Sequence, residues 1–388
     1  MVWFAMAIPV LTALVLFVLF KHRTVWWEFF IPVGVSALLI FICKTCTETL
    51  QTLDKEYWGG WVTKAEYYEE WDERVPCRHP KYKAVTRTRS DGSTYTEWVF
   101  DGYEHLYDVD YHSPYWQVSE SNGYTLSVNS NRFDELAMKF GNKKKVDLGR
   151  SYHSIDGDKW VATWKGSDET LEPVVTIHSY ENRVQASDSI FNFPEVNPEE
   201  YGLFEYPRIT DYYRCPSILG NSGPAHAEAN RLLDIWNAKL GAMKQVRIWI
   251  LVFVDKPYDT ALKQEAYWKG GNKNEFIVAI GVDKQRAVKW CYAFSWTEVE
   301  QLKVEARNFV IQQKELDLVK VVEWLGPEIQ KKFVRKQFAD FSYITVEPPL
   351  WAVILIFLIT IAVNVGVSAW IVYNEFHEES RRRFNSYY

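Results

Sequence analysis

The sequence lacks a surplus of positive charge, since 44 Lys and Arg stand against 50 Asp and Glu and give a formal net charge of −6. Nucleic-acid binding depends on clustered Lys and Arg that neutralise phosphates, so this balance disfavours a nucleic-acid partner. Familiar catalytic motifs are also missing: there is no P-loop, no GxSxG nucleophile elbow, no HExxH and no pair of CxxC motifs. An enzyme would therefore have to assemble its catalytic groups from distant positions in the chain.

Cysteine is scarce, and the five residues present cannot all pair within one chain because their number is odd. Cys43 and Cys46 have CxxC spacing, which suits redox or metal chemistry. They follow an apolar run, however, and we interpret them as small residues at a helix end. Cys77 and His79 have the spacing of half a metal site, but the sequence shows no evident second half.

Apolar residues are concentrated near the two ends of the chain. Three runs, at about 3–20, 25–43 and 350–373, contain few charges. Each has roughly the length that a helix rising about 1.5 Å per residue needs to cross a bilayer core of about 30 Å. We therefore expect three transmembrane helices, the first two forming a hairpin. Asn364 in the third run either bonds a neighbouring helix or is tolerated alone.

Short basic segments flank these spans and predict their orientation. The first two spans are joined by Lys21-His22-Arg23-Thr24, and the C-terminal tail also carries clustered arginines. Because such segments prefer the cytoplasm, we expect the joining loop and the tail inside and residues 44–349 outside. The expected membrane-interface anchors are Trp26, Trp27, Trp351, Lys21, Arg23, Arg381, Arg382 and Arg383.

Residues 49–206 are expected to form a β-rich outer domain. Short alternating segments begin at Tyr57 and continue to about Lys145, and Asp91-Gly92 favours a tight hairpin between Lys81–Arg89 and Thr94–Phe100. Asn131–Phe140 fits a short helix. A further segment, Val174–Ser187, is predicted to be extended.

Residues 207–345 are expected to form an α/β domain. Gln245–Val254 and Phe276–Val282 are continuous apolar segments, typical of strands buried on both faces, and the helical pattern of Tyr258–Trp268 lies between them. Strand, helix and strand in this order favour a right-handed βαβ unit. The expected fold class is an α+β membrane protein, with a transmembrane hairpin at 1–48, the two outer domains, and a third span and tail at 346–388.

Polar residues at the ends of these two strands make a candidate ligand site. Asp255 follows the first strand and Asp283 the second, so parallel strands would project both carboxylates from one edge of the sheet, where ligands gather in open α/β sheets. Such a pair could bind Ca²⁺ or Mg²⁺ through its oxygens. The alternative is that both are turn residues. Asn272 and Asn274 precede the second strand and start at the opposite edge.

The segment Gln245–Ser295 resembles the TPM domain family. The likeness rests on its apolar strand, the following helix, the Gly270-Gly271-Asn272-Lys273-Asn274 turn and the strand ending Ala279-Ile280-Gly281-Val282, and it covers roughly residues 220–320. That family occurs in membrane-anchored proteins facing extracytoplasmic compartments, including a thylakoid protein of photosystem repair and a modulator of acetylcholine receptors. Some members are reported as phosphatases, others as assembly factors or modulators.

A broader resemblance concerns the whole chain. The spans, the segment Tyr57-Trp-Gly-Gly-Trp-Val62 and the segment Tyr180-Glu-Asn-Arg-Val184 look like those of uncharacterised membrane proteins of large tailed phages and some bacteria. This resemblance implies a bacterial inner membrane, with residues 44–349 in the periplasm.

A second candidate metal site is the polar stretch Glu104–His112. If it is a strand, Asp108, Asp110 and His112 share one face and His105 points the other way. Same-face neighbours about 6.6 Å apart could share an ion. The simpler interpretation is a polar strand facing solvent.

Three functions fit these patterns. The favoured one is a membrane-anchored interaction or assembly protein without catalysis, whose partner is an envelope or phage protein or a second copy of the chain. The alternative is a metal-dependent, phosphatase-like hydrolase using Asp255 and Asp283. A transporter is disfavoured, because ion paths usually carry ionisable groups within the bilayer and these spans hold little besides Asn364 and Glu28.

Overall fold

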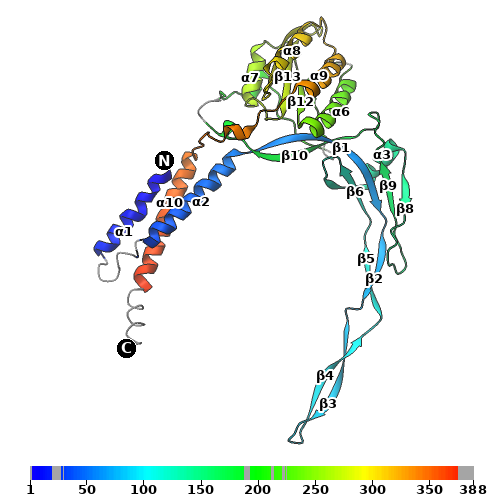
Figure 1. Cartoon of the computed structure of the whole chain (residues 1–388), viewed down its shortest axis with the longest axis vertical. Helices are drawn as coiled ribbons and strands as arrows, with labels where there is room; N and C mark the ends of the chain where they lie inside the picture. The colour runs from blue at the N-terminus through cyan, green and yellow to red at the C-terminus, as the bar shows by residue number, and fades with distance from the viewer. Residues whose placement is uncertain are drawn as a thin grey trace.

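The structure is a computed structural model that describes residues 2–19, 28, 30–187, 193–210, 214–220, 223 and 225–374. It is a mixed α+β protein with three long apolar helices, antiparallel sheets and one mixed sheet (Figure 1).

Three helices are long and apolar enough to span a bilayer, as expected: Val2–Leu19, Phe30–Thr52 and Leu350–Tyr373. The first combines η1 (Val2–Met6) and α1 (Ala7–Leu19), the second is α2 (Phe30–Thr52), and the third belongs to α10 (Leu350–Asn374). They pack together around a small shared core that includes Ile40 and Ile356. This arrangement is compatible with an integral membrane protein.

The second helix extends further than predicted, to Thr52 rather than Cys43. In its polar last turns, Thr47 and Thr52 donate their hydroxyls to the carbonyls of Cys43 and Glu48, at 2.7 and 2.9 Å. Cys43 and Cys46 therefore lie within α2, and neither forms a disulfide. The predicted start at residue 25 lies outside the described residues.

The amide inside the third span has a partner on the second. Asn364 of α10 donates to Ser36 Oγ of α2 at 2.5 Å and to the carbonyl of Thr360 at 2.8 Å. Of the two predicted alternatives, the bond to a neighbouring helix is the one found.

The β-rich domain is built on β1 (Leu53–Tyr68), which continues directly from α2. The first half of β1 pairs with β10 (Pro173–Glu181), and its second half pairs with β6 (Tyr115–Glu120) and β9 (Lys159–Thr163). The outer strands are β7 (Thr125–Val128) and β8 (Lys144–Val146). Helix α3 (Ser130–Phe140), close to the predicted helix, packs Phe133 and Leu136 onto this sheet.

A long two-stranded arm projects from this domain, to the same side as the three helices (Figure 1). Its proximal ribbon pairs β2 (Trp71–Pro76) with β5 (Tyr107–His112), and its distal ribbon pairs β3 (Pro80–Thr88) with β4 (Thr94–Tyr103). The tip is the predicted hairpin, closed by a bond of 2.8 Å from the Arg89 amide to the Ser93 carbonyl.

The α/β region contains the predicted parallel pair. Strands β12 (Arg247–Val254) and β13 (Glu275–Val282) run parallel and are joined through α7 (Asp259–Tyr267). At the sheet edges lie β11 (Ile218–Leu219), parallel to β12, and β14 (Val288–Ser295), antiparallel to β13. One face packs against α6 (His226–Lys244), α8 (Glu300–Ile311) and α9 (Leu318–Lys332), and the other packs against α7.

Three short helices complete the described structure: α4 (Arg183–Ala186), α5 (Pro198–Tyr201) and η3 (Phe338–Phe341). The first corrects the prediction that Val174–Ser187 is extended throughout. Asn182 caps α4 by accepting a hydrogen bond of 3.0 Å from the Gln185 amide, so the strand ends at Glu181.

Candidate functional site

The two predicted aspartates lie at neighbouring strand ends. The amide of Asp255 donates to the carbonyl of Val282 at 2.8 Å, which holds the end of β12 beside the end of β13. Asp255 has φ of 52°, a left-handed conformation that Asp tolerates well. Its carboxylate lies 3.6 Å from Lys284 Nζ. This geometry is that of a turn residue at the carboxyl edge of the sheet.

Asp283 closes the next turn. Its carboxylate accepts hydrogen bonds from the amides of Gln285 and Ala287, at 3.0 and 2.9 Å, and pairs with Lys289 Nζ at 2.8 Å. The hydrogen bond from Lys289 contributes most to lowering the pKa of Asp283 below its usual value. Within the described residues, neither aspartate belongs to a group of three or more potential metal ligands.

The two predicted asparagines lie at the opposite edge, where Asn272 bonds a buried glutamate, Glu275. The amide of Asn272 donates to Glu275 at 2.8 Å, and its side chain donates to Tyr206 Oη at 2.9 Å. Asn274 is fully buried and donates to the carbonyl of Tyr57 at 2.8 Å. Asn274 therefore ties β1 of the β-rich domain to the α/β sheet. A pocket of about 410 Å³ lies beside Asn272.

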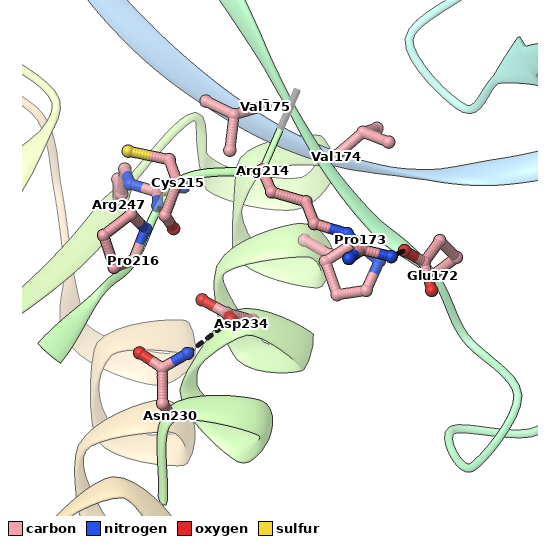
Figure 2. Close-up of a pocket in the computed structure, with 11 residues that line it drawn as sticks. Glu172, Pro173, Val174, Val175, Arg214, Cys215, Pro216, Asn230, Asp234 and Arg247 are labelled. Atoms are coloured by element: carbon pink, nitrogen blue, oxygen red, sulfur yellow. Dashed lines mark hydrogen bonds and ion pairs between the residues drawn. The ribbon is translucent and has the colours of Figure 1, made fainter. Parts of the chain in front are cut away.

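A second pocket, of about 270 Å³, lies where β10 meets the α/β domain (Figure 2). Its lining carries four charged residues, and each is held within the chain. Glu172 pairs with Arg214 at 3.1 Å, and Asp234 accepts from Asn230 at 2.9 Å. The guanidinium of Arg247 donates to the Cys215 carbonyl at 3.0 Å. Of these bonds, the Glu172–Arg214 pair joins the two regions, and the other two lie within the α/β region.

The second predicted metal group is divided among different partners. Asp108, Asp110 and His112 do share one face of β5, as the alternating burial shows. Asp110, however, pairs with Arg78 at 2.5 Å, and His112 bonds Glu73 at 3.0 Å. Of the three, only Asp108 belongs to a group of three or more potential metal ligands among the described residues.

Asp108 instead belongs to a cluster with Cys77, His79 and His105, whose ligand atoms all lie within 4.8 Å of one another. His79 Nδ1 lies 4.0 Å from Cys77 Sγ and 3.2 Å from Asp108 Oδ1. His105 Nε2 contacts the same Asp108 oxygen. The expectation that His105 points away from Asp108 was wrong, because β5 begins only at Tyr107 and His105 lies in the bend before it.

The hairpin register explains how these residues meet. Pro80 pairs with Tyr103 at the base of the distal ribbon, and Pro76 pairs with Tyr107 at the end of the proximal one. Residues 77–79 therefore face 104–106. Pro76 and Pro80 lie at the two ends of the interruption between the ribbons. Proline has no N–H to donate to a neighbouring strand, which favours an end of strand pairing at both positions. Extending the predicted hairpin register past Lys81 would have placed His105 opposite the Cys77–His79 pair.

The carboxylate of Asp108 is ionised at neutral pH. The hydrogen bond from His105, followed by that from the Arg78 amide, lowers the pKa of Asp108 to about 2. The cluster thus combines one carboxylate, two imidazoles and one thiol, of which Cys77 is buried.

The distal ribbon has two chemically different faces. Side chains directly opposite each other in an antiparallel pair share a face. One face, here named the uncharged face, consists of Tyr82, Ala84, Thr86, Thr88, Thr94, Thr96, Trp98 and Phe100. The other carries ion pairs, including Lys83 with Asp101 at 2.7 Å. Trp98 is 69% exposed and Phe100 51%.

The predicted membrane-interface residues are mostly beyond what the structure describes. Trp351 lies in the first turn of α10 and is exposed. The other predicted anchors, Trp26, Trp27, Lys21, Arg23 and Arg381–Arg383, lie outside the described residues.

Comparison with known proteins adds no assignment, because no family model, no curated protein and no solved structure matches this chain. The resemblance to the TPM domain family and the domain boundaries stay predictions.

Proposed function

We propose that this protein is a membrane-anchored extracytoplasmic interaction protein that holds a partner protein at the membrane through the uncharged face of its arm. The arm is the observation that carries the proposal. A ribbon of two strands is marginally stable alone and leaves both edges unpaired, so a persistent one is best explained by a partner.

The composition of the uncharged face favours a protein partner. The few residues that supply most of the binding energy at protein interfaces are enriched in Trp and Tyr, and Phe is also enriched at interfaces. Trp98, Phe100 and Tyr82 provide them here, and the threonines toward the tip supply hydrogen-bonding groups. Charged groups are absent from this face, as in the core of a protein interface.

The position of the arm supports a partner at the membrane. The arm and the three helices leave the outer domains on the same side (Figure 1). In Figure 1 the arm runs down alongside the three helices and its tip reaches past the lower end of α10, so with the helices in a bilayer the arm extends to the level of the membrane. The partner is therefore a membrane-associated envelope protein, a phage protein or a second copy of this chain.

The same proposal includes a TPM-like domain at about 220–320 and a bacterial inner membrane. The parallel β12–α7–β13 unit and the Gly-Asn loop before β13 support the domain assignment. The hydrolase alternative stays a prediction, and the turn geometry of Asp255 and Asp283 gives it no added support.

Photocrosslinking tests the arm directly. p-Benzoylphenylalanine replaces Trp98 on the uncharged face or, as a matched control on the same strand, Tyr95 on the charged face. Irradiation of membranes holding the full chain is expected to give a discrete protein adduct from position 98 and much less from position 95. An adduct of twice the chain's mass identifies a second copy. No protein adduct at position 98, or equal adducts at both positions, would overturn the proposal.

A further inference from the structure

We propose that Cys77, His79, His105 and Asp108 bind one Zn²⁺ ion, which cross-links the two strands of the arm at the interruption between its ribbons. This site is independent of the partner proposed above. Cys77 and His79 lie in the segment between β2 and β3, His105 lies in the bend before β5, and Asp108 lies within β5.

The distances between the ligand atoms suit a tetrahedral ion. Zn–N and Zn–O bonds of about 2.0–2.2 Å and a Zn–S bond of about 2.3 Å place neighbouring ligand atoms about 3.3–3.6 Å apart. The separations of 3.2 Å between His79 and Asp108 and 4.0 Å between His79 and Cys77 lie close to these values. Shifts of about 1 Å or less would complete the geometry, since no pair exceeds 4.8 Å.

The kinds of ligand select zinc over the hard cations expected from sequence. Ca²⁺ and Mg²⁺ take oxygen ligands, and this cluster offers one carboxylate beside a thiol and two imidazoles. Thiolate and imidazole are the usual ligands of Zn²⁺. One thiolate and one carboxylate also balance the double charge of the ion. Four protein ligands fill a tetrahedral shell, as in structural rather than catalytic zinc sites.

Backbone groups around the cluster already orient two of the ligands. The amide of His79 donates to Cys77 Sγ at 3.4 Å, and the amide of Arg78 donates to the second oxygen of Asp108 at 2.6 Å. Such outer hydrogen bonds fix metal ligands and stabilise their charged forms. The exposed His79–Asp108 and His105–Asp108 ion pairs alone would contribute little, because surface pairs are typically worth under about 1 kcal/mol.

The ion would link the two strands of the arm at a point where few backbone hydrogen bonds join them. Between Pro76 and Pro80 the described backbone keeps one cross-strand hydrogen bond, of 3.0 Å, from the Glu104 amide to the His79 carbonyl. A metal joining residues 77–79 to residues 105–108 would fix the angle between the two ribbons. The distal ribbon would then be held at a set direction from the membrane-anchored body.

Metal titration tests the site. Full-length protein without a histidine tag, in detergent and reducing buffer, is stripped of metal and titrated with Co²⁺ as a probe for Zn²⁺. We expect one Co²⁺ per chain, with a thiolate-to-cobalt charge-transfer band that one equivalent of Zn²⁺ removes and excess Ca²⁺ or Mg²⁺ does not. Absence of stoichiometric binding, or binding without the thiolate band, would overturn the proposal.

Matched variants assign the ligands. Cys77→Ser and Asp108→Asn are expected to weaken Zn²⁺ binding at least about 100-fold, beyond the effect usual for an outer-shell change. Two controls should bind Zn²⁺ with the affinity of the parent protein: the single variant His112→Ala and the double variant Cys43→Ser, Cys46→Ser. Unchanged affinity in Cys77→Ser, or equal loss in His112→Ala, would refute the assignment.

Hydrogen exchange tests the bracing role. Zn²⁺ should slow amide exchange at residues 77–79 and 104–106 in the parent and leave the folded Asp108→Asn protein unchanged. Tight Zn²⁺ binding with unaltered exchange there would refute the cross-link.

Discussion

At the scale of single residues, the molecule contains a buried carboxylate without a counter-charge. Glu120, at the end of β6, is 4% exposed, and neither of its carboxylate oxygens has a hydrogen-bond partner among the described residues. Burial raises the pKa of Glu120 to about 7. The folded state therefore favours the protonated acid, and stability falls as pH rises from the unfolded value near 4.5 through about 7.

Replacing this acid by its neutral isostere should remove that pH dependence. We expect Glu120→Gln to raise the free energy of unfolding at pH 8 by up to about 3 kcal/mol, at about 1.4 kcal/mol per pKa unit, and to change it little at pH 4. Thermal unfolding followed by tryptophan fluorescence at both pH values measures the difference. A variant less stable than the parent at pH 8 would show that the carboxylate is needed in its charged form.

Glu172 has the opposite response and makes a useful contrast. Burial alone would raise its pKa, but the hydrogen bonds from Arg132 and Lys139 outweigh burial and lower it to about 2. Its contribution to stability is present above the ordinary value of 4.5 and is lost as pH falls through about 2. Burial raises the pKa of both carboxyl groups, so the presence or absence of cationic partners decides whether the pKa ends below or above its ordinary value.

At the scale of elements, a glycine pair lets β1 cross helix α6. A Cβ on Gly241 of α6 would lie 2.1 Å from the Gly59 carbonyl oxygen, and one on Gly59 would lie 2.0 Å from the Asn237 carbonyl oxygen. No side chain fits between these backbones, so the close approach of the two outer domains depends on both glycines.

A methyl group added at Gly241 should push α6 away from β1. We expect Gly241→Ala to destabilise the protein by about 1–3 kcal/mol, the usual cost of overpacking, and to lower its unfolding midpoint. Gly366→Ala in α10, where a Cβ meets nothing within 4 Å, is the control and should be neutral or slightly stabilising. Equal midpoints for the two variants would contradict the crossing.

The elements that sequence could predict are those whose pattern is local. The apolar runs, the Asp91-Gly92 hairpin and the strands around Ile250 and Val278 carry their own signal of length or composition. The end of α2 was missed because the helix continues through polar residues, and hydropathy marks only its apolar part.

Only half of the metal cluster, Cys77 and His79, was predicted, because its other ligands are not marked by a local pattern. Cys77-x-His79 is a local signal, whereas its partners are brought there by strand register and by a bend before β5. Alternation, which places His105 and Asp108 on opposite faces, applies only inside a strand. The crossing at Gly59 and Gly241 and the contact of Asn274 with Tyr57 depend on how domains pack, so the sequence carries no local sign of them.

At the scale of the whole molecule, the domains between the long apolar helices are joined to such helices at both of their ends. α2 runs into β1 without a break, and α10 begins a few residues after η3, so with these helices in a bilayer two connections would hold the domains near it. An arm on such a body keeps its direction relative to the bilayer better than one on a single flexible tether.

The predicted orientation can be tested with single thiols on the arm tip and the tail. In a Cys43→Ser, Cys46→Ser background, which removes the thiols of α2, Ser90→Cys marks the arm tip and Ser386→Cys marks the tail. Because short basic segments are retained in the cytoplasm, a membrane-impermeant maleimide should label Ser90→Cys in intact bacterial spheroplasts and Ser386→Cys only after the membrane is disrupted. The parent background should remain weakly labelled, since its remaining cysteines are buried. The reverse pattern would place the arm in the cytoplasm, where a periplasmic envelope partner could not reach it, and would refute the proposed function together with the orientation.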